Sequence, residues 1–263
     1  MANDIKLIIN FMKKVFLLLM TVTAMLSCSK DNSQTVDEKK DCLITTVDMG
    51  LKDEGILHLK YDSQNRVSQV KFEMDETDWG GKHRMLEYNI SYTSNNVTII
   101  GDESALFTLD SKGRIIKSVE SDSGEHTYIY NSEGFLEKII SKGNTDHVFT
   151  YLNGNLKSYV NDPYNIFTEY DLNNPYVPYS YDITQQSGII QYAYGIVLYE
   201  QGYYGKKSQN RVRQISGSGI GGGKHDYSYI QDEKTGKMKS VFINQKYDSS
   251  TDLERINFTY SCD

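Results

Sequence analysis

The segment Y-D-S-Q-N-R-V at residues 61–67 decides the fold, because closely similar segments recur along the chain. Residues 109–115 have the sequence L-D-S-K-G-R-I, and residues 130–136 have Y-N-S-E-G-F-L. A shorter form occupies residues 151–156, and a longer one occupies residues 229–238. We call these segments hairpin boxes. The starts at 109, 130 and 151 are 21 residues apart, which indicates one structural unit used repeatedly.

Each hairpin box has the chemistry of a tight turn between two strands. Asp or Asn accepts hydrogen bonds from the backbone of the turn, and Gly or Asn tolerates a positive φ. Apolar and polar residues alternate around the first box, with Leu57 and Leu59 before it and Val70 and Phe72 after it. This period of two is typical of half-buried strands, and 21 Tyr and 9 Phe among 263 residues suit such a surface.

We therefore predict an all-β fold, an antiparallel meander of short hairpins curled into an open or partly closed barrel, with at most one short helix. Expected strands such as residues 126–130 and 135–140 are shorter than the ~9–11 residues that span a bilayer, which argues against a pore. Two stretches depart from the repeat. Residues 159–183 contain all three prolines and are predicted to form a long loop, and residues 189–199 are predicted to form the helix.

The N-terminus has the pattern of a targeting segment. Lys13 and Lys14 precede a largely apolar run of 12 residues, 15–26, which is too short to span a bilayer as a helix but suits a signal peptide. The run ends in Met25-Leu26-Ser27-Cys28, which resembles a bacterial lipobox with Cys28 as the acylated residue. The alternative is an ordinary signal peptide with an incidental cysteine. We expect residues 1–28 to be the lipoprotein signal, residues 29–41 a polar tether, and residues 42–263 a single β-repeat domain.

Charge and cysteine content limit the partners and the compartment. The formal net charge is −7, and removal of residues 1–28 leaves 25 basic and 34 acidic residues, a net charge of −9. That field repels phosphate-rich partners, so we expect no nucleic-acid binding. Cys42 and Cys262 stand at the two ends of the β domain, and an envelope compartment permits a disulfide between them. Two separately buried thiols are the alternative.

Together these features resemble a family of Bacteroidetes outer-membrane lipoproteins of unknown function that have a porin-like, curled β-sheet fold. The likeness rests on the Ser27-Cys28-Ser29-Lys30-Asp31 start, the hairpin boxes, residues 92–100 with their Asn95-Asn96 turn, and residues 202–210. It covers roughly residues 43–261. The resemblance implies a porin-like fold and an outer-membrane address, and the acidic residue after Cys28 resembles a surface-export signal. It carries no assigned activity or catalytic residue.

Motifs for catalysis, cofactors and metals have no support in this sequence. Residues 217–222 match G-x-G-x-x-G, but the residues from Lys224 onward have a strand pattern where a dinucleotide site needs a helix, so no cofactor is expected. His126, His147 and His225 each stand at the start of an expected strand and could meet at one rim of the sheet, where a metal site is conceivable. They lack zinc-site spacing, so polar residues closing turns are the preferred interpretation, and no metal is expected.

Aromatic residues in polar surroundings are the remaining candidates for ligand contacts. Trp79 lies in an acidic, glycine-containing segment, and Tyr164, Tyr170, Tyr176 and Tyr179 lie among Asn and Asp in the expected proline loop. Flat rings beside amides and carboxylates suit a carbohydrate or a peptide. The alternative is that these rings fold back and cover an open end of the sheet.

The sequence thus predicts a lipid-anchored protein of the cell envelope whose role is unassigned. The leading hypothesis is a non-catalytic binding or assembly module for a glycan or a protein partner. The alternative is a hydrolase that uses carboxylates to act on an envelope or dietary polymer. Two close carboxylates with raised pKa values would favour the hydrolase, and an aromatic platform without them would favour binding.

Overall fold

The computed structural model describes residues 42–50, 55–76, 82–143, 146–180, 193–218, 223–246 and 251–262. The expected signal segment, residues 1–28 with Cys28, and the expected tether, residues 29–41, therefore lie outside the described residues. The strands are β1 Leu43–Asp48, β2 Ile56–Tyr61, β3 Val67–Glu76, β4 Lys82–Tyr92, β5 Asn96–Gly101, β6 Ala105–Leu109, β7 Ile115–Glu120, β8 Gly124–Tyr130, β9 Leu136–Ser141, β10 His147–Leu152, β11 Asn155–Asn161, β12 Tyr164–Pro175, β13 Asn210–Gly217, β14 Lys224–Gln231, β15 Met238–Lys246 and β16 Thr251–Ser261.

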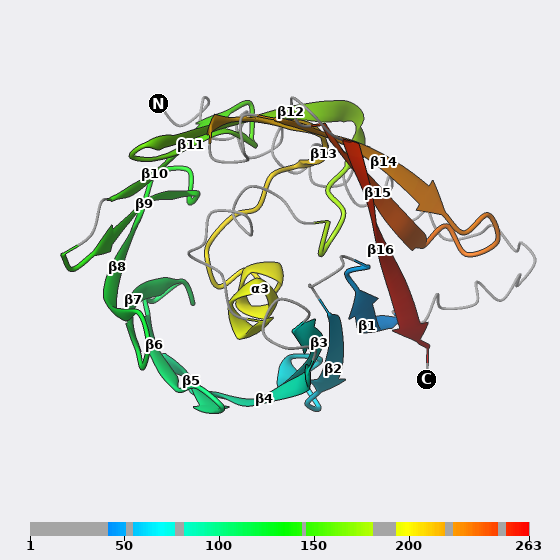
Figure 1. Ribbon diagram of the computed structural model, residues 1–263. Coiled ribbons are helices and arrows are strands. Elements are labelled where there is room, and N and C mark those ends of the chain that lie inside the picture. The colour runs from blue at the N-terminus through cyan, green and yellow to red at the C-terminus, as the bar shows by residue number, and fades with distance from the viewer. Residues whose placement is uncertain are drawn as a thin grey trace, which may run out of the picture. The chain divides into compact units, whose positions relative to one another are not determined.

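These strands form a closed barrel in which every strand pairs with its sequence neighbours. All pairings are antiparallel, and β1 pairs with β16 from Leu43↔Ser261 to Asp48↔Asn257, which closes the ring (Figure 1). The predicted antiparallel meander curled into a barrel is confirmed. The prediction left closure open or partial, whereas the structure closes the sheet completely and so leaves it no free edge.

The hairpin boxes form turns with the predicted chemistry. Asp62 Oδ1 accepts hydrogen bonds from the backbone N–H groups of Gln64 at 2.8 Å and Arg66 at 3.0 Å, and Asn65 takes a φ of 58°. The second box repeats this arrangement with Asp110 as the acceptor and Gly113 at a φ of 78°. Because these bonds join residues two and four apart, the turn is specified locally.

Side chains that point inward from the strands fill the barrel together with one short helix. Helix α3, Ala193–Glu200, lies within the ring of strands (Figure 1), and its residues from Ala193 to Tyr199 are buried. Tyr194 packs edge-on against Tyr88 at 5.1 Å between ring centroids and against Phe107 at 6.2 Å. A helix that is apolar on all sides is typical of a buried position. Among the described residues, no helix is long and apolar enough to cross a membrane.

The predicted helix at residues 189–199 overlaps α3, and its first four residues lie outside the described part of the chain. The loop predicted for residues 159–183 is wrong over most of its described length. Tyr159 belongs to β11, and β12 runs from Tyr164 to Pro175. The prolines do not interrupt this hairpin, because Pro163 lies in its turn and Pro175 ends β12, where fewer ladder hydrogen bonds are required.

Candidate functional site

One end of the barrel carries the hairpin boxes, and we call it the box rim. The turns after β2, β6, β8, β10 and β14 lie there, because consecutive antiparallel strands alternate in direction. The chain after β12 also leaves the sheet at the box rim, and it returns at β13. We call the described part of this connection, residues 176–180 and 193–209, the insert.

Several pairs of neighbouring strands diverge as they approach the box rim, and at five of these pairs a tyrosine hydroxyl bridges the gap. The ladder between β13 and β14 covers only Gln214↔Asp226 to Ser216↔Lys224, and beyond it the Tyr229 hydroxyl donates to the Val212 carbonyl at 2.6 Å. The same arrangement recurs across β1–β2, β3–β4, β7–β8 and β15–β16. The further donors and acceptors are Tyr61 to Ile44, Tyr92 to Val67, Tyr130 to Ile115 and Tyr260 to Met238.

Cationic side chains lie over most of these bridging rings. Arg66 stands 4.4 Å from the centre of the Tyr92 ring, and Arg114 stands 4.3 Å from that of Tyr130. Each arginine also pairs with the aspartate of its own hairpin box. Burial raises the pKa of Tyr61, Tyr92, Tyr130 and Tyr260, so these hydroxyls stay protonated and can donate.

The insert covers one arc of the box rim, from β7 to β11. The Tyr203 carbonyl accepts from the Ile115 backbone N–H at 2.8 Å, and the Lys206 N–H donates to the Gly134 carbonyl at 3.0 Å. The Ser208 hydroxyl accepts from the Leu156 N–H at 3.1 Å. These contacts occupy backbone groups that the diverging strands leave unpaired, so this arc is sealed.

A buried carboxylate ties the two described parts of the insert together. Glu200 accepts hydrogen bonds from the Tyr176 hydroxyl at 2.7 Å and from the Tyr179 N–H at 2.8 Å, and its other oxygen lies 3.0 Å from Lys207 Nζ. Burial raises the pKa of Glu200, while Lys207 and the two hydrogen bonds favour its charged form. Tyr176 and Tyr179 are thus held against the end of α3.

The opposite arc, from β12 through β16 to β1, contains two neighbouring pockets that share Arg211. The first has a volume of about 640 Å³, and we call it the strand-gap pocket because it lies where β13 and β14 diverge. It is lined by Tyr170, Asp171, Leu172, Asn173, Arg211, Val212, Arg213, Tyr227, Ser228 and Tyr229. The second, of about 320 Å³, is the disulfide pocket. It is lined by Cys42, Ile44, Pro175, Tyr176, Val177, Pro178, Arg211, Gln231, Met238 and Tyr260.

Polar groups in the strand-gap pocket are held in place by an ion pair. Arg211 Nε and Nη2 donate to Asp171 Oδ2 at 3.0 and 2.8 Å, and the guanidinium lies 4.8 Å from the centre of the Tyr229 ring. The hydrogen bonds from Arg211 lower the pKa of Asp171, so this carboxylate stays charged at neutral pH. The pocket therefore combines tyrosine rings with fixed donors and acceptors.

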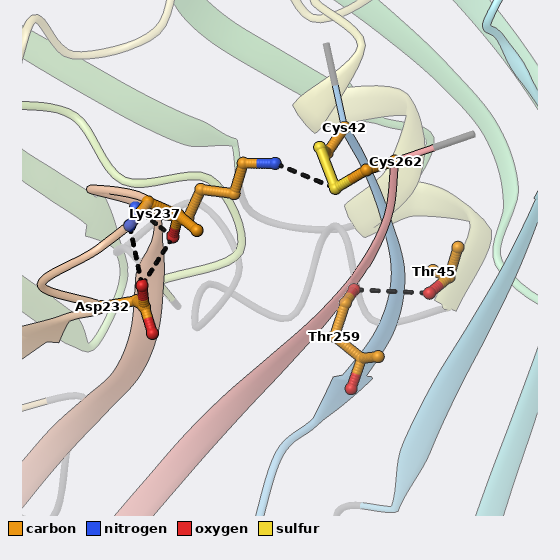
Figure 2. The surroundings of a disulfide bond; sticks show 7 residues. Cys42, Thr45, Asp232, Lys237, Thr259 and Cys262 are labelled. Atoms are coloured by element: carbon orange, nitrogen blue, oxygen red, sulfur yellow. Dashed lines mark hydrogen bonds between the residues drawn. A yellow bond between two sulfur atoms is a disulfide. The ribbon is translucent and has the colours of Figure 1, made fainter. Parts of the chain in front are cut away.

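A disulfide between Cys42 and Cys262 closes the box rim where no turn joins β16 to β1 (Figure 2). Its cysteines are 220 residues apart in sequence. Lys237 extends from the turn after β14 and places Nζ 3.3 Å from Cys262 Sγ, and the backbone of the same turn bonds Asp232 N–H to the Lys237 carbonyl at 2.8 Å. The structure thus has the disulfide that the sequence left as one of two alternatives.

The structure separates the aromatic residues that the sequence proposed as ligand contacts. Tyr170 lines the strand-gap pocket and Tyr176 lines the disulfide pocket. Tyr179 is buried beside Glu200, and Tyr164 lies at the other end of β12 with 49% of its surface exposed. Trp79 lies outside the described residues.

Sequence reasoning missed Arg211, Tyr227 and Tyr229 as pocket residues. Tyr229 stands first in the last hairpin box, so its position at the box rim could have been read from the repeat. No sequence signal connects Arg211 to Asp171, because the two residues lie 40 positions apart on paired strands.

The other rim holds the histidines and a carboxyl with a raised pKa. His126 bonds to Ser141 at 2.7 Å and to Ser123 at 3.0 Å, and His147 bonds to the Tyr159 hydroxyl at 2.7 Å. Burial, with a smaller effect of His126, lowers the pKa of His147 to about 4. Within the described part of the chain, no three His, Cys, Asp or Glu residues gather into a group that could hold a metal ion.

The carboxyl with the raised pKa belongs to Glu103, which lies in the turn between β5 and β6. Partial burial, followed by the charge of Asp122, raises its pKa to about 7. Nearby Glu120 is buried and accepts hydrogen bonds from Ser118 at 2.8 Å and from the Tyr194 hydroxyl at 3.2 Å. The structure thus places one carboxyl with a raised pKa near a buried carboxyl group.

Comparison with known proteins bears on the fold alone. No family model and no curated protein matches the sequence. Among solved structures, a porin-like protein from Bacteroides uniformis ATCC 8492 matches with a TM-score of 0.63 at 15% identity, over 83% of this chain and 96% of that chain. The fold is similar to a porin-like barrel. A porin-like protein from Bacteroides vulgatus ATCC 8482 matches with a TM-score of 0.53 at 15% identity, over 84% of this chain and 99% of that chain.

Proposed function

We propose that this chain is a lipid-anchored protein of the cell envelope whose barrel is a non-catalytic binding module for a glycan. The strand-gap pocket is the observation that carries the proposal. Its volume of about 640 Å³ lies within the usual range for ligand pockets, and Tyr170, Tyr227 and Tyr229 supply ring surface. Asp171, Arg211 and Asn173 supply the donors and acceptors that sugar hydroxyls require.

Attachment through a lipid suits this barrel better than insertion into the bilayer. The strands from β5 to β11 have five to seven residues, fewer than the ~9–11 of membrane-spanning strands. The ion pair Lys117–Glu125 joins β7 to β8, and Lys138–Asp146 joins β9 to the residue before β10, both through side chains that are partly exposed to solvent. Charges in such positions are unfavourable against lipid. The packing of α3 inside the barrel also argues against a solute channel.

The anchor is tested by metabolic labelling. Cells that express the chain and are fed an alkyne fatty acid should label the wild-type protein at Cys28, and Cys28→Ala should abolish the label. Cys42→Ala with Cys262→Ala is the matched control, because it removes the other two cysteines and should leave the label unchanged. Equal labelling of Cys28→Ala would contradict lipidation at this residue.

The binding site is tested with a chain that starts at Ser29, which keeps every strand of the barrel. A thermal-shift panel of polysaccharide fragments, peptidoglycan fragments and peptides should yield a glycan that raises the midpoint by several degrees, since saturation at a hundred times the Kd adds ~2.7 kcal/mol. Tyr170→Ala should abolish that shift. Tyr164→Ala, on the same strand but outside the pocket, should preserve it. A shift with peptides alone would favour a protein partner.

The hydrolase remains the second candidate, and Glu103 is the observation that favours it. A carboxyl with a pKa of about 7 is suited to general acid catalysis, and Glu120 and Asp122 lie close enough to influence its charge. Turnover of any glycan hit that Glu103→Gln abolishes, with binding retained, would support the hydrolase over the binding module.

A further inference from the structure

The disulfide pocket differs in chemistry from the strand-gap pocket. Its walls are mostly apolar and come from distant parts of the chain: Ile44 on β1, Met238 on β15, Tyr260 on β16 and Val177 in the insert. Cys42 places the disulfide at the same wall. Sugar hydroxyls would lose their hydrogen bonds to water against such walls, so a largely apolar molecule is the better occupant.

Two cationic side chains stand at this apolar cavity. Among the described residues that line it, the charged one is Arg211. Lys237 stands next to the cavity, with Nζ 3.3 Å from Cys262 Sγ and 5.2 Å from the centre of the Tyr260 ring. Asp171 balances the charge of Arg211, so Lys237 supplies the further positive charge beside the cavity. Lys237 therefore favours an anionic group at this end of the pocket.

Arg211 retains hydrogen-bonding capacity for such a group. A guanidinium has five N–H donors, and the bonds to Asp171 come from Nε and Nη2 on one edge. The remaining edge can form the paired hydrogen bonds for which arginine suits carboxylates. Arg211 also lines both pockets, so its side chain lies beside a ligand in either one.

We infer that the disulfide pocket binds an amphipathic monocarboxylate, with its apolar body against Ile44, Val177 and Met238 and its carboxylate at Arg211. The volume of about 320 Å³ suits a small molecule, at the lower end of the usual range for ligand pockets. This site adjoins the proposed glycan site and shares Arg211 with it, but the inference does not depend on glycan binding.

Calorimetric titration of the chain that starts at Ser29 tests the inference with decanoate as the probe and decanol as its uncharged match. Decanoate should bind at a single saturable site, and decanol should bind at least tenfold more weakly because it lacks the carboxylate. Equal affinities, or no binding of decanoate, would overturn the inference. This comparison uses the wild-type protein, so its outcome is independent of how any variant folds.

Variants locate the bound probe. Ile44→Trp narrows the cavity and should abolish decanoate binding, whereas Ile230→Trp adds the same ring at an exposed neighbouring position on β14 and should not. Arg211→Gln should weaken binding at least tenfold, and Arg211→Lys should retain part of the affinity. If Ile44→Trp leaves decanoate binding unchanged, the probe binds elsewhere and the inference about this pocket is wrong.

Tyr170→Ala should leave decanoate binding intact, so failure of the glycan proposal is distinguishable from failure of this one.

Discussion

At the scale of single residues, a tyrosine hydroxyl takes the place of a backbone donor where two strands diverge. A carbonyl that leaves a ladder near the barrel interior requires another partner, because an unpaired buried polar group is costly. Tyr61, which donates to the Ile44 carbonyl at 2.6 Å, illustrates this substitution. The first and last hairpin boxes therefore perform two tasks, since Asp62 and Asp232 close the turns and Tyr61 and Tyr229 bridge to the adjacent strands.

Tyr61→Phe should lower the free energy of unfolding by about 1–2 kcal/mol, because the ring stays while the Ile44 carbonyl loses its donor. Urea denaturation measures the change. Tyr164→Phe is the matched control, since the hydroxyl of this exposed tyrosine should contribute close to nothing to the free energy of unfolding. Equal losses of unfolding free energy in the two variants would show that the hydrogen bond from Tyr61 does not stabilise the fold.

Glu103 should make stability depend on pH. Its pKa is raised to about 7 in the folded protein, so the folded state holds a proton that the unfolded chain releases at lower pH. The contribution to stability is complete below the unfolded pKa, near 4.5, and is lost as the pH rises to about 7. Glu103→Gln should flatten the fall in the urea midpoint between pH 5 and pH 7.5. Glu133→Gln, in an exposed turn, should keep the wild-type slope.

At the scale of elements, the insert is held by a close approach of two backbones at the box rim. Gly205 has a φ of 85°, and a Cβ there would lie 2.6 Å from the Gly134 carbonyl oxygen and 2.8 Å from the Tyr130 ring. Glycine is required for both reasons, since the conformation and the space each exclude a side chain. The close contact between the insert and the turn after β8 therefore depends on glycine at position 205.

Gly205→Ala should destabilise the protein by about 2–3 kcal/mol, from a left-handed conformation and a clash with backbone. Gly202→Ala separates the two effects. Gly202 has a similar φ of 84° and nothing within 4 Å of its Cβ position, so that variant should lose only about 1 kcal/mol. Urea denaturation of both variants measures the difference, and equal losses would show that the contact with Gly134 is unimportant.

At the scale of the whole molecule, closure depends on the pairing of the first and last strands. The Cys42–Cys262 disulfide stands at the box rim, directly beside Leu43↔Ser261, the last pair of the β1–β16 ladder. Because the bond links residues 220 apart, it restricts the unfolded chain far more than a local crosslink would.

Replacing both cysteines, Cys42→Ser with Cys262→Ser, should lower the free energy of unfolding by up to about 5 kcal/mol according to the chain-entropy model. The rate of amide hydrogen exchange should rise first in β1 and β16, since the disulfide no longer links the ends of these two paired strands. The wild-type protein under reducing conditions should behave in the same way. Uniform exchange across all strands would contradict a local role in closure.

Local chemistry in the sequence determined the turns, the strand alternation and the antiparallel order, because each depends on residues a few positions apart, such as Asp62 with Arg66. The same reasoning failed at Pro163 and Pro175, where composition indicated a loop although both prolines occupy ends of a hairpin. Only the tertiary structure decided complete closure, the tyrosine bridges and the two pockets. These features join residues such as Asp171 and Arg211, or Cys42 and Cys262, that meet through the curvature of sixteen paired strands rather than through any spacing in the chain.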